Sequence, residues 1–316
     1  MNIHKIVIPT PYAVGDVNAF LVKGDALTLF DAGPKTEEAL EAIQFGIKEA
    51  GYKLSDIDQV VLTHHHPDHA GWVDAFPTKD ILGHQYVDYW LRQEKSFVDY
   101  RLEFYKHQLQ VQAVPEPYLS YILEVRGELE MIGRTPLTKT LSHGEEVPGH
   151  KDLIAYYTPG HAQSHLIFHD KQTNEVIGGD LLLDKVSSNP LVEPPVDLTF
   201  ERPLSLLQYN ESLKFIADLH PTVVYTGHGE NVVNANQLVE ERLARQHKRA
   251  MKVLEMLTTP KTIFEVTTEL FPKVYAKQPG LTLSETLGQL DYLVDRQLAT
   301  IKKHDSIEYY QKIELS

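Results

Sequence analysis

The sequence predicts an α/β fold in which short apolar strands alternate with amphipathic helices, followed by a small C-terminal unit. Strand-like runs at 19–22, 26–30 and 59–62 surround a segment of helical spacing at 36–50. The 316 residues exceed one ordinary domain and suit one larger α/β domain with an appendage. Hydrophobic residues make up 42% and charged residues 23%, which is typical of a globular protein.

The first 62 residues predict a strand hairpin, a helix and a buried strand. A Lys-Gly-Asp turn at 23–25 separates the first two apolar runs. Residues 31–34 break the second run, and Thr36 is placed to act as the N-cap of a helix that extends to Ala50. The apolar strand 59–62 then leads directly into a run of histidines.

Residues 85–135 predict an insertion of at least two amphipathic helices, separated near Pro115 and Pro117. The insertion is rich in aromatic side chains, namely Trp90, Phe97, Tyr100, Phe104, Tyr118 and Tyr121. These rings either pack in the core or line a substrate pocket beneath a lid. On the second interpretation, the candidate substrate-binding residues are Tyr100, Phe104 and Tyr121.

The strand pattern returns after the insertion. The predicted elements are strands at 154–158, 165–168 and 175–179, a Pro- and Ser-rich loop at 184–200, a helix at 204–219 and a strand at 222–225. We therefore expect one α/β domain over residues 1–235.

The C-terminal quarter predicts a linking helix at 236–257 and a small domain at 258–316. In that domain a helix at 261–270 precedes a second helix, for which Thr282 and Glu285 resemble a capping box. Two short strands then form a hairpin, and helix, helix, hairpin is the order of a winged helix. From residue 241 onward, 12 basic and 10 acidic side chains give a net charge of only +2. This charge is too weak to indicate a surface that binds nucleic-acid phosphates, so dimerisation or packing on the α/β domain is favoured.

The histidine run carries the chemistry. His64, His66, Asp68 and His69 occur within six residues, just after a strand, where binding loops are commonly placed. In an extended segment, side chains two residues apart point the same way, so His64 and His66 can bind one ion together. Pro67 then turns the chain, which lets Asp68 and His69 face a second position.

Three more polar residues follow apolar strands far along the sequence, namely His161, Asp180 and His228. Each lies beside glycine, which permits tight turns and close approach of the backbone to a ligand. By contrast, His65 lies between two candidate ligands and should face the other way. His165 is expected to make a structural hydrogen bond.

Together these motifs resemble the metallo-β-lactamase fold superfamily over roughly residues 3–235. The resemblance implies a four-layer αβ/βα sandwich with two metal ions at one edge of its two sheets. The implied ligands of the first metal are His64, His66 and His161. Those of the second are Asp68, His69 and His228, with Asp180 bridging the two ions. Asp31 would support the metal loop.

The implied activity is metal-dependent hydrolysis by a hydroxide shared between the ions, with Asp68 as the catalytic residue that orients it. Imidazole and carboxylate ligands favour zinc but leave iron and manganese open. The chain has no cysteine, so no disulfide forms and no thiolate binds metal. True β-lactamase activity is disfavoured, because those enzymes often carry a cysteine at the second site.

Charge and hydropathy limit the substrate classes and the cellular compartments that the sequence favours. The formal charge is −14, with −16 on residues 1–240, so a polyanionic partner is repelled overall. A small-molecule thioester, ester or lactone is therefore the favoured substrate. Among thioester hydrolases, a glyoxalase II is disfavoured, because the C-terminal region does not resemble the glutathione-binding helical domain of that family. With no signal-like start and no apolar run of about 18 residues, we expect a cytoplasmic protein that does not enter membranes and that can form a homodimer.

Two other functions remain open at this point. One is a metal-dependent ribonuclease acting on single-stranded RNA, because the winged-helix-tailed branch of the superfamily includes one. Against it, no basic stripe lies near the motifs and only about 48 residues separate Asp180 from His228, too few for an inserted nucleic-acid domain. The other is a non-hydrolytic protein, either a binding protein or a single-iron oxidative enzyme. The full set of second-metal residues argues against it.

Overall fold

The computed structural model describes residues 1–76, 79–116, 118 and 129–314. Its first sheet has six strands in the order β1-β2-β3-β4-β5-β6. Their bounds are Ile3–Ile8, Val17–Lys23, Leu27–Phe30, Gln59–Val61, Asp80–Gly83 and Lys139–Thr140. The first three strands pair antiparallel and the last three continue parallel, so β3, β4 and β5 all end at the same edge.

The second sheet has four strands in the order β10-β9-β8-β7. In chain order, β7 to β10 span Leu153–Tyr157, Leu166–Asp170, Glu175–Gly179 and Val223–Thr226. Strands β9 and β10 are parallel and the other pairs antiparallel. The two sheets meet just beyond β10, where His228 pairs with Val17 at the start of β2.

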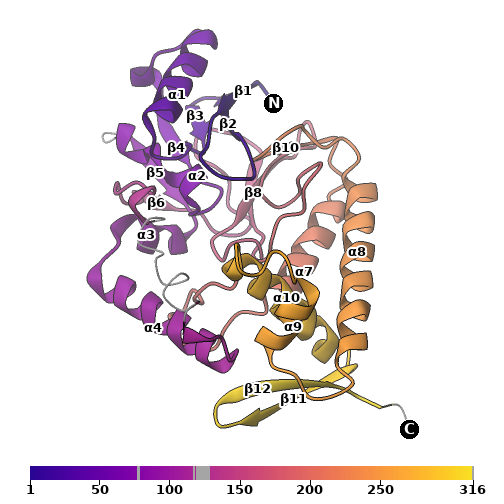
Figure 1. Ribbon diagram of the computed structural model, residues 1–316. Coiled ribbons are helices and arrows are strands. Elements are labelled where there is room, and N and C mark those ends of the chain that lie inside the picture. The colour runs from indigo at the N-terminus through magenta and orange to yellow at the C-terminus, as the bar shows by residue number, and fades with distance from the viewer. Residues whose placement is uncertain (77–78, 117, 119–128, 315–316) are drawn as a thin grey trace.

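Helices cover the outer faces of both sheets (Figure 1). Those associated with the first half of the chain are α1, α2, α3 and α4, at Glu37–Glu49, Pro67–Ala70, Gln85–Arg92 and Lys95–Val111. Those of the second half are α7, α8, α9 and α10, at Ser205–Asp218, Ala235–Met256, Ile263–Leu270 and Pro279–Asp295. Two short 3₁₀ helices lie at Leu54–Asp56 and Trp72–Ala75.

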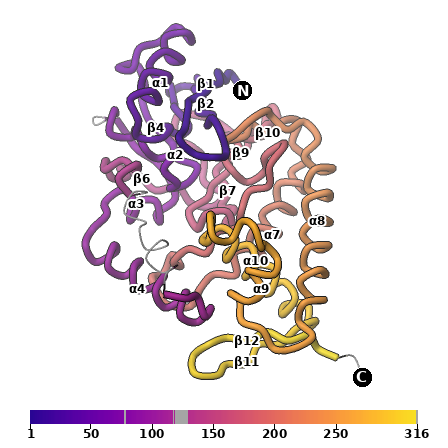
Figure 2. The backbone as a smooth tube through the Cα atoms, in the orientation of Figure 1, coloured from indigo at the N-terminus to yellow at the C-terminus, as the bar shows by residue number. Residues whose placement is uncertain are grey.

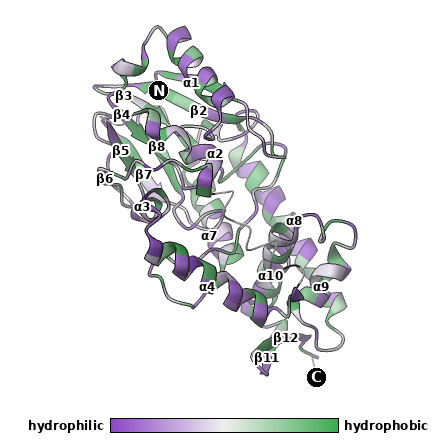
Figure 3. Ribbon diagram, turned by 60° about the vertical axis from the view of Figure 1, so that its left-hand side comes forward, coloured by the Kyte–Doolittle hydropathy of each residue, from purple (hydrophilic) through white to green (hydrophobic). Residues whose placement is uncertain are grey.

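Three buried apolar clusters separate four layers, which confirms the predicted αβ/βα sandwich. The cluster between the sheets includes Phe30 and Phe168, whose rings meet edge to face at 5.0 Å. A second cluster packs α1 and α3 on the first sheet, and a third packs α7, α8 and α10 on the second. Figure 3 shows the same division, with green strands inside and alternating purple and green turns in α1 and α4. The hydrophobic effect thus brings the strand ends of two sheets to one edge.

The structure confirms the N-cap at Thr36 and the helices of the insertion. The Thr36 hydroxyl accepts a hydrogen bond from the Ala39 backbone N–H at 3.2 Å, so this residue caps α1. The insertion between β5 and β6 contains α3 and α4, and Trp90, Phe97 and Phe104 within them are buried.

Two candidate substrate-binding residues of the insertion take part in packing and hydrogen bonding within the protein. Phe104 is 0% exposed, so its ring offers no surface to a substrate in this structure. The Tyr100 hydroxyl donates a hydrogen bond to the Thr199 carbonyl, which ties α4 to the loop before α7. Tyr121 lies outside the described residues. Core packing therefore accounts for most of the described aromatic side chains.

The C-terminal region follows α8, which runs along one side of the molecule (Figure 2). The helices α9 and α10 precede a hairpin of β11 (Ala299–His304) and β12 (Ile307–Lys312). The predicted capping box at Thr282 is wrong, because α10 already begins at Pro279 and the Thr282 hydroxyl donates to the carbonyl of Gln278, the N-cap residue. A capping box is instead present at Thr262 and Glu265, at the start of α9.

Across the described ranges, none of the helices combines the length and apolar character that a membrane crossing requires.

Candidate metal centre

The structure brings all seven predicted ligands together at the edge where the two sheets meet. Four come from the loop and short helix after β4, and the others come from the loops after β7, β9 and β10. Their ligand atoms form three overlapping groups, each within 4.8 Å: His64, His66 and His161; His64, His69 and Asp180; and Asp68, His69 and His228. Motifs that are far apart in the sequence therefore form one cluster, because the strands that they follow end close together.

Asp31 holds the histidine loop in place from below. One carboxylate oxygen accepts the Thr63 backbone N–H at 2.8 Å. The other accepts the Thr63 hydroxyl at 2.9 Å and Nδ1–H of His69 at 2.8 Å. Asp31 follows β3 with a φ of +63°, a left-handed conformation that non-glycine residues seldom adopt. Because a carboxylate only accepts, His69 carries a proton on Nδ1, and in the neutral ring that binds metal the lone pair is on Nε2.

Two further histidines are oriented by backbone carbonyls in the same way. Nδ1 of His161 lies 3.0 Å from the Asn189 carbonyl oxygen, and Nδ1 of His228 lies 2.8 Å from that of Asp16. A carbonyl oxygen only accepts, so each Nδ1 donates, and in the neutral ring that binds metal the lone pair is on Nε2. Both Nε2 atoms point into the cluster.

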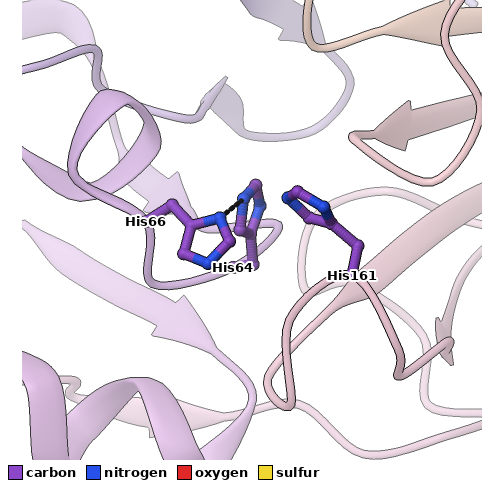
Figure 4. Close-up of side chains that lie close together, drawn as sticks. All are labelled: His64, His66 and His161. Atoms are coloured by element: carbon purple, nitrogen blue, oxygen red, sulfur yellow. Dashed lines mark hydrogen bonds between the residues drawn. The ribbon is translucent and has the colours of Figure 1, made fainter. Parts of the chain in front are cut away.

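His64 and His66 complete the set with opposite ring nitrogens. Nδ1 of His64 donates to the Thr63 hydroxyl oxygen at 2.9 Å, because that hydroxyl is itself committed to Asp31. Nε2 of His66 donates to Glu193 at 3.0 Å. Nε2 of His64 and Nδ1 of His66 are left facing each other at 3.0 Å, and Figure 4 shows both rings converging with that of His161. Five imidazoles thus aim their inner ring nitrogen at one site.

The buried polar atoms of this site fit metal ions. Among the described residues, Nε2 of His69, His161 and His228 and Oδ1 of Asp180 are buried without a hydrogen-bond partner. Asp180 lies 3.4 Å from Nε2 of His69 and 3.5 Å from Nε2 of both His161 and His228. Each orphaned buried polar atom costs about 1–3 kcal/mol. A divalent cation bound by nitrogen and oxygen donors would satisfy all of them.

Charge is divided unevenly across the cluster. Burial, and then the neighbouring histidines, lower the pKa of His64 well below its ordinary value. Burial lowers the pKa of His161 to about 4. For His228, burial opposes charge, but Asp180 and Asp68 outweigh it and raise the pKa to about 10. Burial therefore favours neutral rings at His64 and His161, whereas neighbouring carboxylates raise the pKa of His66 and His228 and favour positive charge there.

The two histidines expected not to be ligands lie as predicted. The His65 ring turns away and stacks on Trp90, with centroids 4.0 Å apart and an interplanar angle of 15°. His165 donates from Nδ1 to the Thr158 hydroxyl at 2.9 Å and accepts the Asp180 backbone N–H at Nε2, at 3.1 Å. Both are held by packing and hydrogen bonds.

Glycine beside the candidate ligands at the strand ends permits the close approach expected from the sequence. A Cβ on Gly227 would collide with Oδ1 of Asp180. Gly179 has a φ of +47°, and a Cβ there would come within 2.9 Å of the Thr63 side chain. A side chain at either position would displace the site.

Glu193 is a site residue that the sequence did not predict. It is 3% exposed and bonded to His66, yet it lies in the segment 184–200, for which the sequence predicts only a loop. The one local signal is an acidic residue between Val192 and Pro194 in an otherwise apolar stretch.

Comparisons with known proteins agree with this geometry. Residues 12–228 match the family described as the metallo-beta-lactamase superfamily. The chain is 39% identical over 312 residues to the "Probable metallo-hydrolase YqjP" of Bacillus subtilis, covering 98% of each chain. It is 25% identical over 241 residues to "Thioesterase pkgB" of Emericella nidulans, covering 76% of this chain and 54% of that protein. The crystal structure of a metallo-beta-lactamase family protein from Thermus thermophilus matches with a TM-score of 0.80 at 26% identity, covering 99% of both chains.

Proposed function

Because this chain belongs to the metallo-beta-lactamase superfamily and is a metallo-hydrolase, we propose that its centre holds two divalent ions and hydrolyses a small acyl compound. The observation that carries the two-ion proposal is the orientation of the five imidazoles. Each has its outer nitrogen bound to an acceptor and its inner nitrogen aimed at the cluster.

The first ion would be held by His64, His66 and His161. The second would be held by Asp68, His69 and His228, with Asp180 between the two ions. This donor set suits zinc, and also iron or manganese. When bound, the ions supply Lewis acidity and lower the pKa of water toward neutrality.

The chain's own residues supply orientation and charge. Asp68 reaches His228 at 3.3 Å and is the acidic group placed to accept a hydrogen bond from an attacking water and hold it in line. Asp31, Thr63 and the carbonyls of Asp16 and Asn189 hold the imidazoles before substrate arrives. This preorganisation avoids a rearrangement during the reaction.

Two observations favour a thioester, ester or lactone as substrate. Residues 1–240 carry a net charge of −16, which disfavours a polyanion such as RNA. One relative over three quarters of this chain is named a thioesterase. All three substrates share a polarised acyl carbon with a sulfur or oxygen leaving group.

We also propose that α9, α10 and the β11–β12 hairpin form a winged-helix-like unit that serves the catalytic domain through packing. Helix α10 contacts both α7 and α8, and its apolar side chains join the cluster beneath the second sheet. The weak net charge of this region gives no support to nucleic-acid binding.

A substrate panel tests the proposed class. Metal-loaded protein should hydrolyse short acyl thioesters, aryl esters or lactones and leave single-stranded RNA intact, measured by thiol or acid release and by gel. An Asp180→Ala variant should be inactive on the same panel. Cleavage of RNA alone would refute the acyl proposal, and equal rates in the variant would place the activity in a contaminant.

A further inference from the structure

Glu193 binds two adjacent histidines at the rim of the metal centre. Its Oε1 lies 3.0 Å from Nε2 of His66 and 3.2 Å from Nε2 of His65. Its Oε2 accepts the backbone N–H of Gln163 at 2.7 Å. The side chain is 4% exposed, so the carboxylate makes these bonds out of bulk water, where they are strongest.

We propose that Glu193 is a positioning residue for the first metal, fixing His66 so that Nδ1 rather than Nε2 faces the ion. The inference rests on the proposed two-ion centre. A carboxylate only accepts hydrogen bonds, so it holds the proton of His66 on Nε2 and leaves the lone pair on Nδ1.

The same carboxylate joins the two segments that supply the first ion's ligands. His65 and His66 belong to the loop after β4, whereas Gln163 comes two residues after His161, in the loop before β8. One side chain therefore fixes the spacing between His66 and His161. Among the described residues, Glu193 bonds to His66, to its neighbour His65 and to the backbone near His161. Because His66 and His161 are proposed ligands of the first ion, loss of Glu193 should affect the binding of that ion alone.

Hydrogen bonding explains the His65–His66–Glu193 group better than a third metal. Nδ1 of His65 lies 2.7 Å from the Ser164 hydroxyl, which also accepts the His65 backbone N–H at 3.1 Å. The hydroxyl can therefore donate to Nδ1 while Nε2–H of His65 donates to Glu193. Both ring nitrogens are committed, so His65 has no lone pair left for a cation.

The loop that carries Glu193 is itself held by the C-terminal helices. The Val192 backbone N–H donates to the Ser284 hydroxyl of α10 at 3.2 Å. Arg242 of α8 donates to three carbonyls at the start of the loop, at 2.9–3.0 Å. The same loop provides the Asn189 carbonyl that orients His161. The loop therefore contacts His66 through Glu193 and His161 through Asn189, which are two of the three proposed ligands of the first ion.

Cobalt titration of the full-length apoprotein tests the inference, with visible absorption reporting each ion. Glu193→Gln is the informative variant, because an amide cannot accept hydrogen bonds at both ends and must turn its NH₂ toward an N–H donor. We expect wild-type protein to bind two equivalents. In the variant one equivalent should weaken about 10–100-fold with an altered spectrum, while the other stays unchanged. Glu201→Gln, an exposed residue just after the same loop, is the matched control and should match wild type.

The outcomes separate this inference from the function on which it rests. Two equivalents bound by Glu193→Gln with wild-type affinity and spectrum would overturn the role of Glu193 alone. An equal weakening of both equivalents, together with a lower melting temperature, would show a merely structural role and also overturn it. Loss of a third equivalent would make Glu193 a ligand and overturn its assignment as a positioning residue. Wild-type protein that binds no cobalt would overturn both proposals.

Discussion

Replacing Asp68 by alanine is expected to lower kcat/KM on the order of 10³-fold or more, while the protein remains folded. The side chain combines two tasks, since it is a proposed ligand of the second ion and the group placed to orient the attacking water. Its nearest charged partners are His228 at 3.3 Å and His69 at 4.0 Å, both within the site. Removing it therefore disturbs the chemistry rather than the apolar core.

Asp99→Ala is the matched control for this prediction. Asp99 is exposed on α4 and forms a surface ion pair with Lys95, so its loss should leave the rate unchanged. Steady-state kinetics and circular dichroism of both variants would decide the matter. Wild-type turnover by folded Asp68→Ala protein would remove the second ion from the proposed mechanism.

Replacing Arg202 by methionine is expected to lower the free energy of unfolding by about 3–5 kcal/mol. Both terminal nitrogens of Arg202 donate to the two oxygens of Asp291 at 2.6 Å, and the carboxylate is 4% exposed. The pair joins the loop before α7 to α10. Loss of the guanidinium leaves a buried carboxyl without its partner, which is the costly way to break such a pair.

Urea unfolding measures this effect, and two further variants control it. Lys95→Ala breaks an exposed pair and should cost less than about 1 kcal/mol. Arg202→Met combined with Asp291→Leu removes both charges and should recover much of the lost stability. A cost for Arg202→Met no larger than that for Lys95→Ala would show that the pair contributes nothing beyond a surface contact.

The fold and the positions of the seven candidate ligands were predictable because their signals are local. Strand and helix periodicities are written in consecutive residues, and a strand end before a histidine or aspartate is visible without knowing the sheet. The packing of strands then brings His161, Asp180 and His228 to the histidine run. His65 could be set aside for a similar reason, since alternation in an extended segment turns it away.

The remaining features depend on contacts that leave no local pattern. Asp16 and Asn189 act through backbone carbonyls, which any residue would provide, and Glu193 acts from an irregular loop. Helical spacing is the same for a core helix and a lid, so Phe104 resembled a substrate contact although it is fully buried. The threonine and glutamate of a capping box also occur inside helices, as Thr282 does in α10.

Metal analysis of the purified protein, with activity measured before and after chelation, tests the central claim most directly. The orientation of five imidazoles around Asp68 and Asp180 predicts close to two equivalents of divalent metal per chain after reconstitution. It also predicts loss of hydrolysis on chelation and recovery on adding metal back. A protein that binds no metal and keeps its full activity in chelator would contradict the account.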